Sequence, residues 1–185
     1  MEEKSKRLTT VVAYVQDRPG VLAKVSMVLR RRNFNIASLV VGHSERPGVS
    51  RMTIVVEGDA REVKQVEKQL YKVIEVLKVF DLAAGSAVLK EVALIRIATN
   101  SSNRAEVIGL AQVFGGRVDD VGRNYVMIEL TASPYSIDRF LRVANDFGVM
   151  ELARTGAVAM SRGEKIISAP VEEAQKSHNG QGTSY

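Results

Sequence analysis

Residues 17–22 carry the types of groups that could bind a small charged molecule. They read Asp-Arg-Pro-Gly-Val-Leu, and they follow an apolar, β-branched run over 8–15 that predicts a strand. Apolar residues at helical spacing predict a helix over 20–31 directly after them. The first turn of a helix presents unpaired backbone N–H groups and the positive end of its dipole, so it binds anions. Asp17 can hold a positive group beside that anion site. The two together would suit a free α-amino acid, which carries a carboxylate and an ammonium group.

The same residue types are also common in ordinary turns before helices, so this segment alone does not separate a binding site from a loop. Gly20 favours the binding interpretation because it lets the backbone approach a ligand closely. Whether the segment forms a binding site depends on the fold that the following residues provide.

Periodicity predicts six elements in the first half and six more in the second. The first half shows strand, helix, strand, strand, helix, strand over 8–15, 20–31, 34–44, 49–57, 60–71 and 73–82. The second half repeats this order, with strands over 92–99, 117–121, 125–131 and 149–160. Its first helix is predicted to start with a capping box at Asn103 and Glu106, and its second with Ser133 as N-cap and Pro134 as first residue.

This order predicts an α+β protein with two tandem ferredoxin-like βαββαβ units, each an antiparallel sheet with both helices on one face. The predicted division is an N-terminal tail over 1–7, a first domain over 8–82, a linker over 83–87, a second domain over 88–163 and a C-terminal tail over 164–185. Strands 8–15 and 34–44 are apolar on both faces, and apolar sheet faces and edges are usually covered. We therefore expect a homodimer whose sheets join edge to edge.

The ordered set of motifs resembles the ACT domain and, more narrowly, the small regulatory subunit of acetohydroxyacid synthase (acetolactate synthase). The resemblance covers about residues 8–163. Its motifs are Asp17-Arg-Pro-Gly-Val-Leu22, Asn33-Phe-Asn-Ile36 with Ser38-Leu39, Ser50-Arg-Met-Thr-Ile54, Glu67-Lys-Gln-Leu70, Glu151-Leu-Ala-Arg-Thr-Gly156 and Ser161-Arg-Gly163.

The resemblance implies a regulatory role in the synthesis of branched-chain amino acids. The partner would be a large catalytic subunit that carries thiamine diphosphate, magnesium and FAD, with no cofactor in this chain. The resemblance also implies feedback inhibition by a branched-chain amino acid, with valine the first candidate, and pairing of ACT domains. The effector would contact Asp17, Arg18, Pro19, Gly20, Val21 and Leu22 of one protomer and Asn35 and Ile36 of its neighbour.

Other functional classes receive less support from the sequence. No nucleophile–base pair, dinucleotide-binding pattern or metal-ligand spacing is present, so we expect neither a catalytic nor a metal site in this chain. The absence of Cys, of a signal peptide and of a long apolar run favours a cytoplasmic protein that does not cross a membrane.

Two alternatives remain at this point. One is an ACT-type sensor that regulates a different enzyme, which would share only the first unit. The other is a ferredoxin-like nucleic-acid-binding module, suggested by the net charge of +5. Such modules stack bases on exposed aromatic side chains, whereas four of the five Phe residues here occupy core-like positions, so we expect no nucleic-acid partner.

Overall fold

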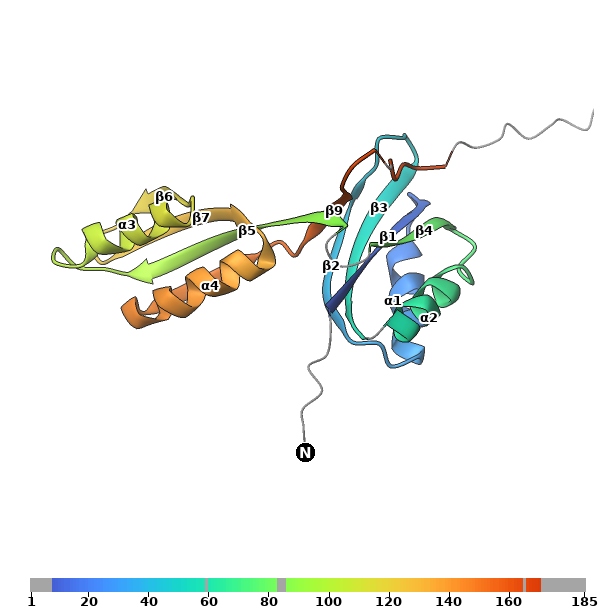
Figure 1. The fold of residues 1–185 in the computed structure, drawn as a ribbon, viewed down its shortest axis with the longest axis horizontal. Coiled ribbons are helices and arrows are strands. Elements are labelled where there is room, and N and C mark those ends of the chain that lie inside the picture. The colour runs from blue at the N-terminus through green and yellow to red at the C-terminus, as the bar shows by residue number, and fades with distance from the viewer. Residues whose placement is uncertain (1–7, 59, 83–85, 165, 171–185) are drawn as a thin grey trace, which may run out of the picture.

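The first sheet has four antiparallel strands and is built from the first half of the chain. The computed structural model describes residues 8–58, 60–82, 86–164 and 166–170, so the predicted N-terminal tail lies outside the described residues. The elements are β1 (Leu8–Gln16), α1 (Val21–Arg31), β2 (Ile36–His43), β3 (Val49–Glu57), α2 (Ala60–Leu70) and β4 (Val76–Leu82). The strand order is β2-β3-β1-β4, and both helices cover one face (Figure 1).

A second sheet is built from the rest of the chain in the order β6-β7-β5-β8. Its elements are β5 (Ala87–Ala98), α3 (Arg104–Val113), β6 (Arg117–Val121), β7 (Tyr125–Ala132), α4 (Pro134–Ala144), a short 3₁₀ turn (Asn145–Phe147), β8 (Val149–Arg154) and β9 (Val158–Ser161). Together the two units confirm the predicted α+β class and the tandem ferredoxin-like arrangement.

Three local predictions are wrong. The last strand, predicted as continuous over 149–160, is broken between β8 and β9, with Gly156 at φ +83° in the break. The first strand of the second unit starts at Ala87, five residues before the predicted start and inside the predicted linker; residues 83–85 lie outside the described residues. Asn103 does not cap α3, because its side-chain oxygen instead accepts a bond of 2.8 Å from the Asn100 amide.

The second helix of this unit begins as predicted. Ser133 is the N-cap of α4, and its hydroxyl accepts a 3.2 Å bond from the amide of Ser136. Pro134 occupies the first turn, where a missing N–H leaves no bond unmade.

The two faces of the first sheet belong to two different cores. Residues Val11, Ala13 and Val15 of β1 face the helices. The alternate residues Val12 and Tyr14 face the other way, as the two-residue period of a strand requires. Both faces of β1 are thus buried.

The second face is covered by the same chain, which corrects the reasoning behind the predicted homodimer. Residues 87–90 of β5 pair with β9 to form a two-stranded ribbon that lies on this face. Ala87 and Ala159 of this ribbon are buried against Val12 and Tyr14. Figure 1 shows β5 running from this ribbon into the second sheet, so one strand serves both units. The apolar face therefore gives no support for a dimer.

The break between β8 and β9 is held tightly against β2. The amide of Ala157 donates a 3.2 Å bond to the hydroxyl of Ser38. A Cβ atom on Gly156 would lie only 2.4 Å from that hydroxyl oxygen and 3.1 Å from Val40 Cγ2. A glycine is thus needed both for the positive φ and for the close approach.

Replacing Gly156 by Ala should lower the thermal midpoint of the full chain more than replacing Gly163 by Ala. Both glycines have a left-handed φ, +83° and +75°, which costs an alanine about 1–2 kcal/mol. Only Gly156 adds a clash, worth about 1–3 kcal/mol on the scale of overpacked cores. Thermal unfolding of the two variants measures the difference, and equal losses would show that the contact with Ser38 is loose.

Candidate effector-binding site

The loop between β1 and α1 is fixed by backbone bonds at the end of the sheet. The Asp17 amide donates to Gly48 O at 2.8 Å, and the Arg18 amide donates to Gln16 O at 3.0 Å. Gly20 takes φ +84° as the N-cap of α1, and no side chain caps this helix. The Val21 amide donates to Arg18 O at 3.3 Å, so within the described residues the first-turn amides that remain available to an anion are those of Leu22 and Ala23.

Charged side chains surround this helix start. Asp17 Oδ2 lies 3.2 Å from His43 Nδ1 at the end of β2. Lys24, one turn into α1, forms an ion pair with Glu75, and the hydrogen bond from Lys24 lowers the pKa of that carboxyl. Asp17 thus gives the helix start a carboxylate, and the helix amides give it a positive field.

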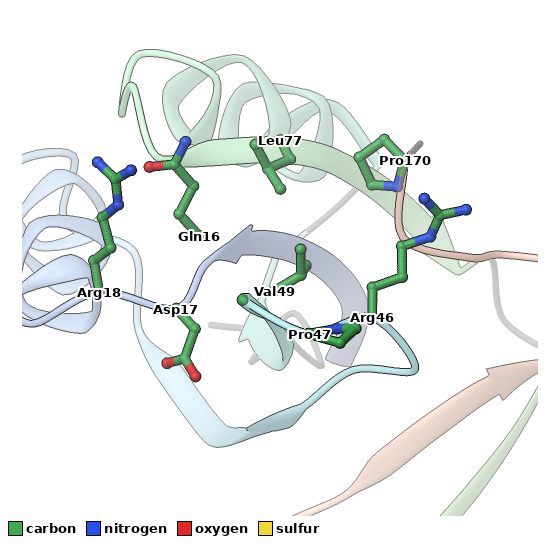
Figure 2. A pocket seen from close by; sticks show the side chains of 9 residues that line it. Gln16, Asp17, Arg18, Arg46, Pro47, Val49, Leu77 and Pro170 are labelled. Atoms are coloured by element: carbon green, nitrogen blue, oxygen red, sulfur yellow. The ribbon is translucent and has the colours of Figure 1, made fainter. Parts of the chain in front are cut away.

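A cleft of about 460 Å³ opens beside the loop. Figure 2 shows the side chains of Gln16 and Arg18 at one end of it, that of Pro170 at the other end and that of Leu77 between them. The Asp17 carboxylate points away from Gln16 and Leu77 (Figure 2). Other lining residues come from the turn between β2 and β3, namely Arg46, Pro47, Gly48 and Val49. The lining thus combines two guanidinium groups, of Arg18 and Arg46, with apolar side chains such as Val49 and Leu77, which suits a ligand with an acid group and an aliphatic part.

One wall of this cleft comes from the predicted C-terminal tail. The Tyr14 hydroxyl donates to Ile167 O at 2.9 Å, and the Ala169 amide donates to Glu45 Oε1 at 2.6 Å. Ala169 is buried in the core beneath the ribbon, and Pro170 reaches the cleft. Residues 166–170 are therefore docked on the first sheet, although their composition gave no sign of it.

The bond from the Ala169 amide lowers the pKa of the Glu45 carboxyl. A carboxyl with a lowered folded-state pKa stabilises the folded state above its unfolded pKa and loses that contribution as the pH falls through the lowered value. The Glu45 contribution to docking is thus present at neutral pH and lost in acid. Burial raises the pKa of Tyr14, which keeps its hydroxyl protonated as the donor to Ile167.

The structure brings together only part of the predicted site. Asp17 and Arg18 line the cleft, Pro19 and Gly20 are exposed at the helix start, Val21 is buried in the core and Leu22 is 45 % exposed. Asn35 and Ile36 lie at the opposite end of the sheet, because Ile36 pairs with Val56 whereas the loop continues from Gln16, which pairs with Val49. Eight residues of β2 separate the two ends by roughly 25 Å at the usual rise of a strand. One chain alone cannot form the predicted site.

Known proteins match this chain along most of its length. The family model for the AHAS small subunit-like ACT domain matches residues 12–78, and the model for the small subunit of acetolactate synthase matches residues 90–163. A probable acetolactate synthase small subunit of Methanothermobacter thermautotrophicus is 43 % identical over 85 % of this chain and 94 % of its own length. Another, from Archaeoglobus fulgidus, is 46 % identical over 84 % of this chain and 98 % of its own length.

A solved structure agrees with these relatives. The crystal structure of the acetolactate synthase small subunit from Thermotoga maritima has a TM-score of 0.79 and 38 % identity, and the match covers 86 % of this chain and 99 % of that chain. The chain belongs to the family of acetolactate synthase small subunits. The second unit also matches a model of this family. An ACT-type sensor of a different enzyme, the alternative that the sequence left open, would share only the first unit.

Sequence reasoning on this family member missed the cleft residues outside the loop. Arg46 and Gly48 could have been found, because the hairpin between β2 and β3 must lie next to the end of β1 in this fold. Leu77 and Pro170 carried no comparable signal. Within the described ranges, no group of three His, Asp or Glu side chains could hold a metal, and no helix there is long and apolar enough to cross a membrane.

Replacing Tyr14 by Phe should loosen residues 166–170. The change removes the donor to Ile167 O, a partly buried carbonyl, at a cost of about 0.5–1.5 kcal/mol. We expect faster amide exchange at Ala169 and a slightly lower thermal midpoint. Tyr135→Phe is the matched control because Tyr135 is 66 % exposed. Unchanged exchange at Ala169 in Tyr14→Phe would show that the hydroxyl does not hold the segment.

Proposed function

We propose that this chain is the regulatory subunit of an acetolactate synthase and that it controls the large subunit in response to a branched-chain amino acid. The observation that carries this proposal is the uncapped start of α1, with Gly20 at φ +84° and Asp17 beside it. The ligand carboxylate would bind the free amides of α1, and its ammonium group would bind Asp17. The first unit is thus the sensor, and the acetolactate chemistry, with thiamine diphosphate, magnesium and FAD, belongs to the large subunit.

The effector site requires a second copy of the chain, and the open edge of β2 is where that copy would bind. In the first sheet β2 and β4 are the edge strands. The β4 edge is blocked at Val79, whose amide donates to the Tyr71 hydroxyl at 3.0 Å. Within the described residues β2 pairs only with β3, so its other edge can accept a strand.

Symmetry then completes the site. Two β2 strands that pair antiparallel across a two-fold axis place the start of one strand beside the end of the other. The start carries Asn35 and Ile36, and the end carries His43, which contacts Asp17. Each effector loop thus meets Asn35 and Ile36 of the other copy, and the dimer has two equivalent sites.

Valine should raise the thermal midpoint of the chain by an amount that grows with the logarithm of its concentration, and the Gly20→Asp variant should lose this effect. No atom lies within 4 Å of a Cβ at Gly20, so the fold should survive while the new carboxylate repels that of the ligand. We expect the affinity to fall about tenfold or more, equivalent to at least roughly 1.4 kcal/mol. Leucine and isoleucine should bind within about a hundredfold of valine, because one methylene is worth only about 1–3 kcal/mol.

The control for this change is Gly163→Asp, at a glycine of similar φ with equally open surroundings. The shared site is tested by mixing Gly20→Asp with Asn35→Ala. Each variant alone breaks both sites of its dimer, but a mixed dimer holds one intact site. In an equal mixture with random pairing, about half of the dimers are mixed, and each mixed dimer has one intact site out of two. About a quarter of all sites should therefore be restored. If titration calorimetry finds no recovery of valine binding in the mixture, Gly20 and Asn35 either belong to a site within one protomer or do not both belong to the site.

The purified chain should form no acetolactate, and it should raise the rate of its large subunit when the two are mixed. Valine should then lower that rate, because it must bind the less active assembled state more tightly. The Gly20→Asp variant should still activate but should resist valine. If the chain does not change the rate of the large subunit, the regulatory role is wrong. If the chain activates the large subunit but the rate does not respond to valine, only the assignment of valine as effector is wrong.

A further inference from the structure

A second polar cleft lies in the other unit, at the start of α3. Its volume is about 690 Å³, and its lining residues are Thr99, Asn100, Ser101, Arg104, Arg123 and Asn124. All six side chains can donate hydrogen bonds, two carry a positive charge and none is acidic. This composition favours a negatively charged ligand.

Two buried polar groups at this cleft have no partner. Thr99 is 5 % exposed, and its hydroxyl oxygen makes no hydrogen bond. Arg104 Nε is also buried and unpaired, although its Nη2 donates to Gly122 O at 3.0 Å and to Arg123 O at 2.6 Å. Buried polar groups are nearly always paired, so two unpaired groups at one cleft indicate that a ligand or ion supplies the missing bonds.

The cleft lies at the start of α3, because the first residue of this helix, Arg104, is one of the lining residues. This helix has ten residues, and no side chain caps it. The amide of Arg104 donates to Asn100 O and that of Val107 to Asn103 O. The intervening amides of Ala105 and Glu106 have no acceptor within the described part of the chain. They lie at the positive end of the helix dipole, which strengthens an anion site.

We propose that this cleft binds a phosphate group, either as the free ion or as part of a phosphate ester. The hydroxyl groups of Thr99 and Ser101 and the guanidinium groups of Arg104 and Arg123 supply more donors than the two oxygens of a carboxylate can use well. A phosphate group offers three or more strong acceptor oxygens, and Arg recognises it with paired bonds. Glu106 lies in the first turn but is not among the residues that line the cleft. The second unit would thus bind phosphate at a site separate from the proposed effector site of the first unit.

The test is a titration of the full chain with inorganic phosphate and, separately, with glycerol 3-phosphate, each against chloride at equal ionic strength. If the phosphate group is recognised as part of an ester, we expect the backbone amide NMR signals of Asn100 and Arg104 to shift with both compounds. If the free ion is the ligand, they should shift with inorganic phosphate alone. Arg104→Gln should weaken the binding about tenfold or more, as expected for a charge-assisted contact. The control, Arg142→Gln, removes an exposed charge from α4 and should leave it unchanged.

Thr99→Val separates binding from folding. The change removes a buried hydroxyl that has no partner, so the unliganded thermal midpoint should stay or rise while phosphate binding weakens. A purely structural role for Thr99 would give the opposite pattern. The proposal is overturned if neither phosphate compound binds better than chloride, if Arg104→Gln and Arg142→Gln weaken binding equally, or if the shifted amides are those of α1 instead.

Discussion

The ribbon of β5 and β9 closes the open face of the first sheet, and the arrangement of both units depends on this contact. A ferredoxin-like sheet with helices on one side leaves its other side bare, and here that side carries the buried residues Val12 and Tyr14, 0 % and 1 % exposed. Burying one such side chain stabilises the fold by about 1.5–3 kcal/mol. A fragment that ended before β5 would expose this apolar face, which favours aggregation. The first unit therefore needs the second unit for its own packing.

This packing connects the effector loop to the rest of the molecule through β1. Alternate residues of β1 lie in the two cores on either side of the sheet, and the chain passes directly from Gln16 into the loop. The docked C-terminal segment rests on the same strand through Tyr14 and reaches the cleft through Pro170. A ligand at the loop can favour one arrangement of these contacts only if it binds that arrangement more tightly, since coupling is a difference in affinity between states.

Sequence periodicity predicted the elements well where a local pattern decides them. Ser133 and Pro134 start α4 as predicted because the cap bond to Ser136 is local. The break at Gly156 could not be predicted, because its reason is the approach to Ser38, more than a hundred residues away. The capping box at Asn103 failed because the backbone amide of Asn100 donates to the same side-chain oxygen.

In the candidate site, too, the sequence predicted the features that depend on neighbouring residues and missed those that depend on residues far away in the chain. The loop from Asp17 to Gly20 could be recognised because its turn and helix start are encoded in neighbouring residues. Asn35 and Ile36 came from the resemblance, and the observed register puts them at the far end of β2. The unpaired Thr99 hydroxyl left no trace in the sequence, since burial without a partner is a property of packing alone.

The proposed effector site, divided between two copies, would have a further thermodynamic consequence. Because the ribbon already covers the face of the first sheet, a second copy is left with an edge contact along β2. Edge pairing of one strand buries less surface than a full sheet-on-sheet contact, so the dimer is sensitive to small additions of free energy. A ligand held by Asp17 of one copy and Asn35 of the other binds only the dimer tightly. By linkage it must then strengthen the dimer by the same factor by which the dimer strengthens ligand binding.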